Sequence, residues 1–176
     1  MIKPRLLILS DLFGGKSSDW VNQYIELLRS KFDIQYYDVL ELGGVATADN
    51  EENNIHNQFL NGGIDKAVKT LLDKESEEVS VLGFSIGGTI AWKAALKGLK
   101  VVQLIAVSST RLRFETQTPN SKIKLYFGEE DLNKPDSQWF LDLKISNQIF
   151  ENEKHQLYLE KKNVLLICNA ILLDLV

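Results

Sequence analysis

The sequence predicts an α/β fold of three layers, in which a doubly wound and mainly parallel sheet of about six strands lies between helices. Two observations predict it. Short apolar runs alternate along the chain with longer stretches of helical periodicity, an order that favours parallel strands joined by crossover helices. Several runs, such as VVQLIAV at 101–107, are almost continuously apolar, as strands covered on both faces are. The 176 residues suit a single domain over 1–176.

The expected elements follow from these patterns in chain order. Strands are expected over 5–10, 34–39, 79–83, 101–107, 123–127 and, with the weakest pattern, 145–150. Helices are expected over 18–31, 64–74, 86–97, 136–143 and 157–173. Residues 43–63 are polar, rich in Asn and bounded by glycine pairs, so a long mobile loop is expected there. That loop would follow the carboxyl end of a strand, where open α/β sheets bind their ligands.

Composition and charge exclude several classes of protein. Hydrophobic residues make up 44% and charged residues 25%, which is ordinary for a soluble domain. The net charge of -4 gives no reason to expect a nucleic acid or an anionic membrane as partner. The single cysteine, Cys168, excludes an intramolecular disulfide and agrees with a reducing compartment. No tract resembles a signal peptide or is long enough to span a bilayer, so a cytoplasmic location is expected.

The most informative stretch is VSVLGFSIGGTIAWKAAL at 79–96, which contains the pattern G-x-S-x-G from Gly83 to Gly87. An apolar strand runs directly into the pattern, and a helical stretch leaves it. A nucleophile elbow needs this order, because its serine lies on a turn so tight that both flanking positions must lack side chains. Ser85 is therefore a candidate nucleophile, and a plain glycine turn is the alternative.

A serine hydroxyl needs a base, and the base needs an acid that orients it. The chain has two histidines: His155 follows the last predicted strand, and His56 lies in the Asn-rich stretch upstream of the serine. In KLYFGEEDL an apolar strand ends at Gly128, and Asp131 lies in the loop beyond it. With His155 as the base, serine, acid and histidine each follow a strand, in that order. The catalytic residues are thus predicted to be Ser85, Asp131 and His155.

A rival motif lies near the N-terminus, where an apolar strand runs into SDLFGGKS. The phosphate loop has the pattern G-x-x-x-x-G-K-[ST]. Gly15, Lys16 and Ser17 fit it, but Ser10 stands where the first glycine is required. Asp38, which follows IQYY near the end of the next predicted strand, would be the candidate for holding Mg²⁺. A nucleotide-binding protein therefore stays open as an alternative.

At these residues the chain resembles the α/β-hydrolase superfamily over nearly its whole length. Residues 83–87 are similar to the nucleophile elbow of that family, 128–131 to its acid loop, and His155 to its final histidine. The segment SDLFGG at 10–15 is similar to H-G-L-F-G-G, which follows the first core strand in small esterases of the family. The resemblance implies that the backbone N–H groups of Leu12 and Ile86 form an oxyanion hole.

The chain also departs from the family pattern. Ser10 and Asp11 replace His and Gly, and Asp11 would bring a carboxylate near the developing negative charge. The two N-terminal strands of the full fold are missing from the predicted order. About fourteen residues separate the strand at 101–107 from the next one, too few for a cap domain. The expected form is a minimal α/β-hydrolase fold with an open site.

The resemblance and the motifs together predict a serine hydrolase that cleaves a small acyl ester or thioester through an acyl-enzyme. It would need no cofactor and no metal, and would be a monomer or a homodimer. A non-catalytic binding protein on the hydrolase scaffold is the second alternative. The pocket is expected to be shallow, with walls from the oxyanion turn, 43–63 and 109–114, and to favour short or medium acyl groups. Arg111 and Arg113 are candidates for meeting an anionic leaving group, and Trp139 and Phe140 are candidates for the pocket or the core.

Overall fold

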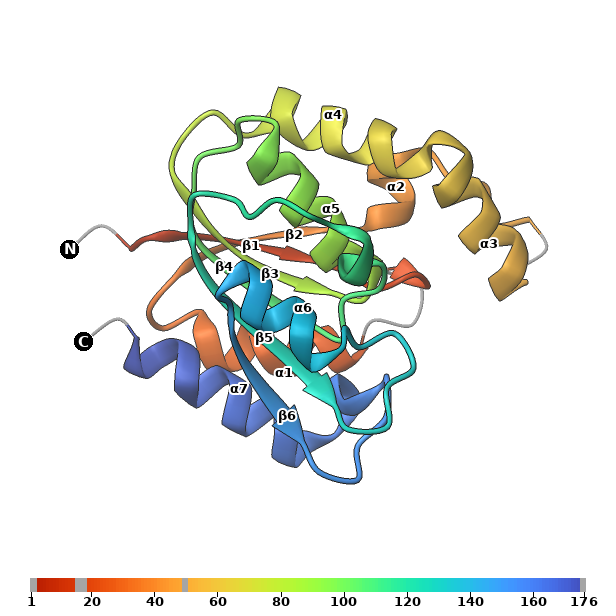
Figure 1. The fold of residues 1–176 in the computed structure, drawn as a ribbon. Helices are drawn as coiled ribbons and strands as arrows, with labels where there is room; N and C mark the ends of the chain where they lie inside the picture. Colours follow the sequence, from red (N-terminus) through yellow and green to blue (C-terminus); the bar gives the residue numbers. More distant parts are fainter. Residues whose placement is uncertain (1–2, 15–18, 49–50, 175–176) are drawn as a thin grey trace.

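A computed structural model describes residues 3–14, 19–48 and 51–174 of the chain (Figure 1). Its centre is a six-stranded sheet in the order β2-β1-β3-β4-β5-β6. Each neighbouring pair of strands is parallel. The strands are β1 (Arg5–Leu9), β2 (Asp33–Tyr37), β3 (Val79–Phe84), β4 (Val101–Val107), β5 (Lys122–Gly128) and β6 (Ser146–Phe150). The predicted fold class, a doubly wound parallel sheet of about six strands, is confirmed.

Helices cover both faces of this sheet and complete the three layers (Figure 1). One face is covered by α1 (Asp19–Leu28) and α7 (Lys161–Leu173). The opposite face carries α2 (Val39–Gly43), α3 (Glu52–Gln58), α4 (Ile64–Lys74), α5 (Ile86–Leu96) and α6 (Ser137–Leu143). In the described part of the chain, no helix is long and apolar enough to cross a membrane.

The two halves of the core follow from the alternation of side chains along each strand. In β1, Leu7 and Leu9 pack under α4 and α5, whereas Leu6 and Ile8 pack under α1 and α7. Successive side chains of a strand point to opposite faces, so a strand buried on both sides must be apolar at every position. Cys168 is buried in the second of these layers, as expected for a packing residue of the last helix.

The expectation of a long loop over 43–63 is wrong. Residues 52–58 form α3, and a kinked stretch, η2 (Phe59–Gly63), with non-helical backbone angles at Asn61 and Gly62, joins it to α4. Ile55 and Phe59 are buried and lie four residues apart, as do Ala67 and Leu71 of α4 beyond the kink. This apolar stripe packs on the core, but the many Asn and Glu residues around it hide the helical periodicity in the sequence. The helix α2 was not predicted either; its N-terminus is capped by the carboxylate of Asp38.

Two predicted elements near the C-terminus have different bounds from those expected. The stretch 157–173 is divided into a 3-10 helix, η4 (Leu157–Leu159), and α7, which begins at Lys161. The strand with the weakest pattern, β6, lies at the edge of the sheet, and four of its five residues are exposed. An edge strand has a neighbour on one side only, so less of it needs to be apolar.

The connections of the chain place a crevice at one end of the sheet. From β1 the chain goes to β2 on one side and then returns to β3 on the other side of β1. At such a switch point the loops leaving the two central strands separate, and open α/β sheets bind their ligands there. The turn at 10–14 follows β1, and Ser85 follows β3. Residues 108–121, between β4 and β5, contain one short 3-10 helix, η3 (Leu112–Phe114), and no cap.

Candidate active site

Ser85 lies on a tight turn between β3 and α5. Its backbone angles are φ 50° and ψ -120°, which residues other than glycine rarely adopt. A Cβ atom at Gly83 would lie 2.6 Å from the Cα atom of Gly88, and one at Gly87 would lie 2.3 Å from the carbonyl oxygen of Ser10. Glycines at both positions therefore permit the turn that the sequence pattern predicted.

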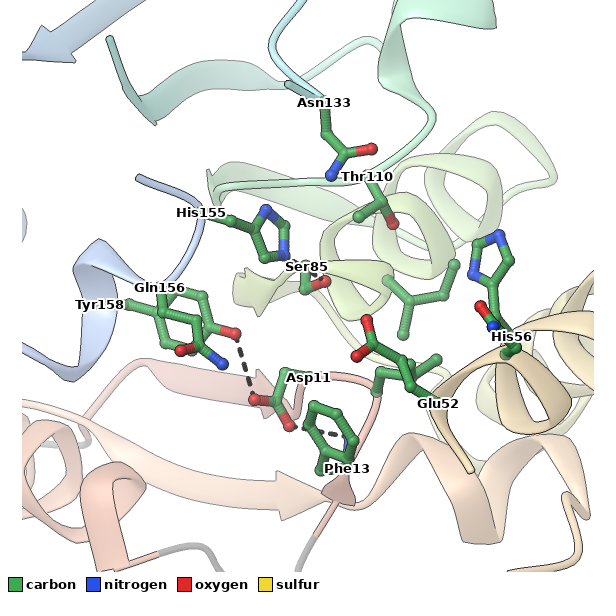
Figure 2. Close-up of a pocket in the computed structure, with 13 residues that line it drawn as sticks. Asp11, Phe13, Glu52, His56, Ser85, Thr110, Asn133, His155, Gln156 and Tyr158 are labelled. Atoms are coloured by element: carbon green, nitrogen blue, oxygen red, sulfur yellow. Dashed lines mark hydrogen bonds between the residues drawn. The ribbon is translucent and has the colours of Figure 1, made fainter. Parts of the chain in front are cut away.

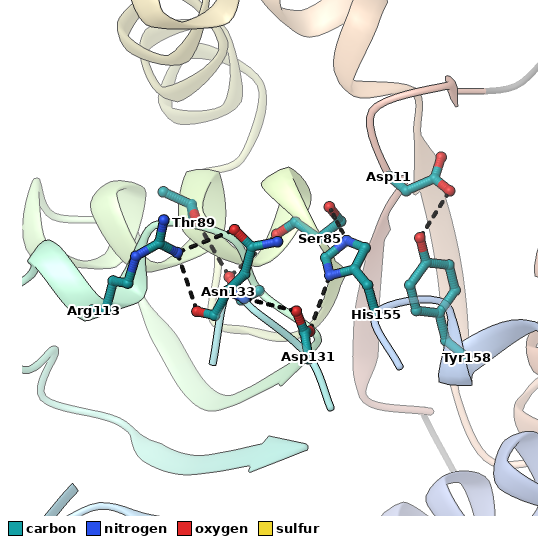
Figure 3. Close-up of polar contacts among 9 residues, drawn as sticks. Asp11, Ser85, Thr89, Arg113, Asp131, Asn133, His155 and Tyr158 are labelled. Carbon is teal, nitrogen blue, oxygen red and sulfur yellow. Dashed lines mark hydrogen bonds and ion pairs between the residues drawn. The ribbon is translucent and has the colours of Figure 1, made fainter. Parts of the chain in front are cut away.

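The side chains of Ser85, His155 and Asp131 form one hydrogen-bonded chain (Figure 3). Ser85 Oγ lies 3.0 Å from His155 Nε2, and His155 Nδ1 lies 3.0 Å from Asp131 Oδ2. With the ring proton on Nδ1, that nitrogen donates to the carboxylate, and Nε2 is left to accept the serine proton. The Asp131 side chain is fully buried, and its other oxygen accepts the backbone N–H of Asn133 at 2.9 Å. The structure thus brings together the three side chains that the sequence singled out.

Backbone contacts hold together the loops that carry Asp131 and His155. The N–H of Glu130 donates to the carbonyl oxygen of Glu153 at 2.9 Å. A Cβ atom at Gly128 would lie 2.2 Å from that same oxygen, so this close approach requires a glycine. The ends of β5 and β6 therefore place the acid beside the histidine.

Other ionisable side chains nearby make different contacts. Glu129 accepts the backbone N–H of Asn152 at 3.1 Å, and Glu130 lies 4.0 Å from the ammonium group of Lys154. His56 lies on α3, across the cavity from the histidine that contacts Ser85 (Figure 2).

The two predicted oxyanion donors, Leu12 and Ile86, both line the cavity next to Ser85. Neither backbone N–H has an acceptor within the parts of the chain that the structure describes. The N–H of Ile86 belongs to the first turn of α5. Backbone donors of a first turn lack partners within the helix and lie at the positive end of the helix dipole. Two such amides beside a serine hydroxyl suit a developing negative charge on a substrate oxygen.

Comparison with known proteins addresses the fold. No family model matches the chain, and no curated protein sequence does. Among solved structures, a protein from Xanthomonas campestris assigned to the α/β-hydrolase superfamily matches with a TM-score of 0.71 and 15% identity, over 99% of this chain and 100% of that one. The carboxylesterase CesB from Bacillus subtilis matches with a TM-score of 0.64 and 14% identity, over 97% of this chain and 82% of that one. The chain has the α/β-hydrolase fold.

A third structure of this fold, a monoacylglycerol lipase from Paleococcus ferrophilus, matches with a TM-score of 0.67 and 12% identity, over 97% of this chain and 94% of that one. These likenesses extend over nearly the whole chain, in agreement with a minimal version of the hydrolase fold. They are too distant in sequence to carry residue roles from one protein to another.

Within this hydrolase fold, the turn after β1 departs from the usual sequence at Ser10 and Asp11. Ser10 Oγ accepts the backbone N–H of Val39 at 2.9 Å and so links the turn to the start of α2. Asp11 is 5% exposed and lines the cavity. Burial raises the pKa of the Asp11 carboxyl, and hydrogen bonds from the Phe13 N–H and the Tyr158 hydroxyl offset part of that rise.

Three residues that sequence reasoning missed hold the backbone of the elbow in place. The carbonyl oxygen of Ser85 accepts hydrogen bonds from Ser109 Oγ at 3.2 Å and from the backbone N–H of Thr110 at 3.3 Å. Thr89 Oγ1 lies 3.2 Å from Ser109 Oγ and also donates to the carbonyl oxygen of Thr110. Ser109 and Thr110 follow a strand and Thr89 lies on α5, and hydroxyl residues are common at both kinds of position, so the sequence carries no signal that separates these three from others.

The cavity over Ser85 has a volume of about 310 Å³ (Figure 2). Its walls come from the turn after β1, from α3 and from the loops that carry Thr110, Asn133 and His155. The lining residues are Asp11, Leu12, Phe13, Glu52, Asn53, His56, Ser85, Ile86, Thr110, Asn133, His155, Gln156 and Tyr158. The expected contribution of residues 43–63 to the pocket is thus made by a helix instead of a loop, and 109–114 contributes Thr110 alone.

Neither arginine lines the cavity, whereas Trp139 and Phe140 take the core role that the sequence left open. Arg113 does not line the cavity; its guanidinium donates to the backbone and side-chain oxygens of Asn133 at 3.2 and 3.1 Å. Arg111 lies with Arg113 over the ring of Phe114 and is not among the residues that line the cavity. Trp139 packs against the core and donates its indole N–H to a backbone carbonyl. The alternative of a core role for this residue is therefore the better one.

The residues that would distinguish a phosphate loop, Gly15, Lys16 and Ser17, lie outside the described residues. Two other residues of the phosphate-loop hypothesis both contact α2: Ser10 accepts a backbone N–H from its first residue, and Asp38 caps its N-terminus. In the described part of the chain, no group of three or more His, Cys, Asp or Glu side chains is placed to hold a metal ion.

Proposed function

We propose that the protein is a serine hydrolase that cleaves a small acyl ester or thioester through an acyl-enzyme. The observation that carries this proposal is the continuous hydrogen-bonded chain from Ser85 through His155 to the buried Asp131. The names of the structural neighbours, among them a carboxylesterase and a monoacylglycerol lipase, support ester substrates.

In the first step, Ser85 Oγ attacks the acyl carbonyl carbon while His155 Nε2 takes the hydroxyl proton. The carbonyl oxygen becomes an oxyanion, which accepts the N–H groups of Leu12 and Ile86. The bond from carbon to the leaving oxygen or sulfur then breaks, and His155 returns the proton to the leaving group. Water, deprotonated by the same nitrogen, attacks the acyl-enzyme and releases the acid and the free serine.

Asp131 supports both steps through the imidazole. Its carboxylate accepts the Nδ1 proton, which fixes the tautomer that leaves Nε2 free to act as a base. The carboxylate also stabilises the imidazolium that forms when His155 takes a proton, because the buried Asp131 side chain is shielded from water on its own side of the contact.

The size of the cavity supports a small acyl group. A volume of about 310 Å³ is at the lower end of ligand pockets, which span roughly 300–1,000 Å³. Each buried methylene adds only about 0.8 kcal/mol, and the few apolar walls, Leu12, Phe13 and Ile86, limit how many can be buried. We therefore expect kcat/KM for p-nitrophenyl esters to be highest for short or medium acyl chains. A steady rise through long chains would contradict this expectation.

The decisive experiment is labelling with a fluorophosphonate probe. Wild-type protein should be labelled at Ser85, and Ser85→Ala should lose both labelling and ester turnover while keeping the circular dichroism spectrum of the fold. Ser137→Ala, which removes an exposed hydroxyl on α6, serves as the matched control and should label normally. Labelling that persists in Ser85→Ala would refute the mechanism. A folded wild type that is neither labelled nor active would favour a non-catalytic binding protein.

A further inference from the structure

A carboxylate lies where the proposed chemistry builds up negative charge. Asp11 directly precedes Leu12, whose N–H is a proposed oxyanion donor, and both residues line the cavity over Ser85. A negative charge at this place opposes the formation of an oxyanion. A carboxylate at this position therefore carries a cost that its other contacts must offset.

Both carboxylate oxygens of Asp11 accept hydrogen bonds. Oδ1 accepts the backbone N–H of Phe13 at 3.1 Å, which closes a small turn around Leu12. The backbone carbonyl of Asp11 accepts the N–H of Gly14 at 3.2 Å and closes the same turn from its other side. Oδ2 accepts the hydroxyl of Tyr158 at 3.1 Å (Figure 3). The side chain therefore shapes the turn and joins it to a distant residue.

Tyr158 is a firm anchor for this contact. It is 2% exposed, and its own carbonyl oxygen accepts the hydroxyl of Tyr24 at 3.0 Å. Its ring packs at centroid distances of 5.0 Å from Trp20 and 5.4 Å from Phe84. Tyr158 also lies three residues after His155, and the two rings meet edge to face at 6.3 Å. Its hydroxyl thus links the segment that carries the base to the turn that carries an oxyanion donor.

We propose that Asp11 and Tyr158 are a positioning pair that holds the Leu12 N–H in register with Ser85 and His155, and that Asp11 acts through its geometry instead of its charge. This inference rests on the proposed function. Neither residue exchanges a proton or a bond with the substrate in this role. The pair sets the distance between the base and the oxyanion donor, and an error of about 1 Å in such a distance costs on the order of 100-fold in rate.

The proposal predicts a different kcat for each of three variants. In Asp11→Asn the amide oxygen can accept the Phe13 N–H, and the amide nitrogen can donate to the Tyr158 hydroxyl, so kcat should stay within a few-fold of wild type or rise. Asp11→Ala loses both contacts, and kcat should fall by about 100-fold with KM little changed. Tyr158→Phe keeps the ring packing but loses one hydrogen bond, and kcat should fall by about tenfold.

The test measures kcat and KM for p-nitrophenyl acetate in these variants and in the double variant Asp11→Ala/Tyr158→Phe. Because the two residues act through one contact, the double variant should be no slower than Asp11→Ala alone. Tyr126→Phe is the matched control: it removes a buried tyrosine hydroxyl on β5 that has no hydrogen-bond partner among the described residues, and kcat should not change.

A second readout does not depend on catalysis. Amide hydrogen exchange at Phe13 should be slow in wild type and Asp11→Asn, faster in Tyr158→Phe and fastest in Asp11→Ala. If the protein proves to have no ester activity, this measurement still decides whether the pair holds the turn. The proposal is overturned if Asp11→Asn is as slow as Asp11→Ala, if the losses in the double variant multiply, or if exchange at Phe13 is the same in all variants.

Discussion

Gly87→Ala tests how closely the elbow must approach the turn after β1. The added Cβ would lie 2.3 Å from the carbonyl oxygen of Ser10 and 2.8 Å from that of Leu9. Both contacts are with backbone atoms, so no side chain can rotate away to relieve them. Ordinary contacts between carbon and oxygen begin at about 3.3 Å, and the two segments must therefore separate by about 1 Å.

That separation moves the two sides of the proposed oxyanion hole apart, because Ser10 leads to Leu12 and Gly87 follows Ile86. A displacement of about 1 Å predicts a loss of about 100-fold in kcat/KM. Overpacking of this kind also costs about 1–3 kcal/mol of stability. For a chain of this length each kcal/mol lowers Tm by about 2–4 °C, so a fall of about 2–12 °C is expected.

Hydrolysis of p-nitrophenyl acetate and differential scanning calorimetry measure the two effects. Gly98→Ala is the matched control, since its φ of 109° strains any side chain but a Cβ there meets no atom of the described residues within 4 Å. It should lower Tm by a similar amount and leave kcat/KM unchanged, because Gly98 lies beyond the far end of α5. A folded Gly87→Ala with kcat/KM within about threefold of wild type would refute the reasoning, since about 1 Å of displacement should cost far more.

Three further predictions concern other parts of the molecule. His155→Ala should lower kcat by about 10⁴-fold or more, whereas His56→Ala should change KM alone. If steady-state kinetics show the opposite pattern, His56 is the base and the assignment of His155 is wrong. Burial by itself raises the pKa of Glu75, but hydrogen bonds from Arg5 and a tyrosine hydroxyl lower it overall. The carboxylate therefore contributes its full stability above the unfolded pKa of 4.5, and this contribution is lost as the pH falls through the folded pKa. The Tm difference between wild type and Glu75→Gln should therefore be constant over about pH 6 to 8 and shrink below about pH 4.5; a difference independent of pH would exclude the carboxylate as its source. Burial raises the pKa of the Cys168 thiol to about 12, so iodoacetamide should modify it only after unfolding, and rapid reaction of the native protein would contradict its burial.

Elements with a strong local pattern were predictable from the sequence. The strand over Val101–Val107 and the helix over Ile64–Lys74 have the predicted bounds. The apolar periodicity of each lies within its own residues, so no knowledge of neighbours is needed to find it. The turn at Ser85 was predictable for the same reason. The tight turn between a strand and a helix needs glycines beside the serine, and this requirement can be found within a few neighbouring residues of the sequence.

The prediction for residues 43–63 was wrong for the opposite reason. Ile55 and Phe59 are too few to mark a helix amid polar residues, and their burial depends on packing of α3 against the core. A short helix is marginal on its own and is stabilised mainly by tertiary contacts. Composition alone favoured a loop, and a helix that forms one wall of the cavity was missed.

By itself, the sequence determined that a strand, a tight turn with a serine, and a helix follow one another, and that an acid and a histidine come later in the chain. Tertiary structure decided which side chains meet. Ser85 and His155 are 70 residues apart, and Asp11 and Tyr158 are 147 apart. Contacts over such separations exist only because the parallel sheet brings the carboxyl ends of its strands to one edge, where loops from distant parts of the chain lie side by side.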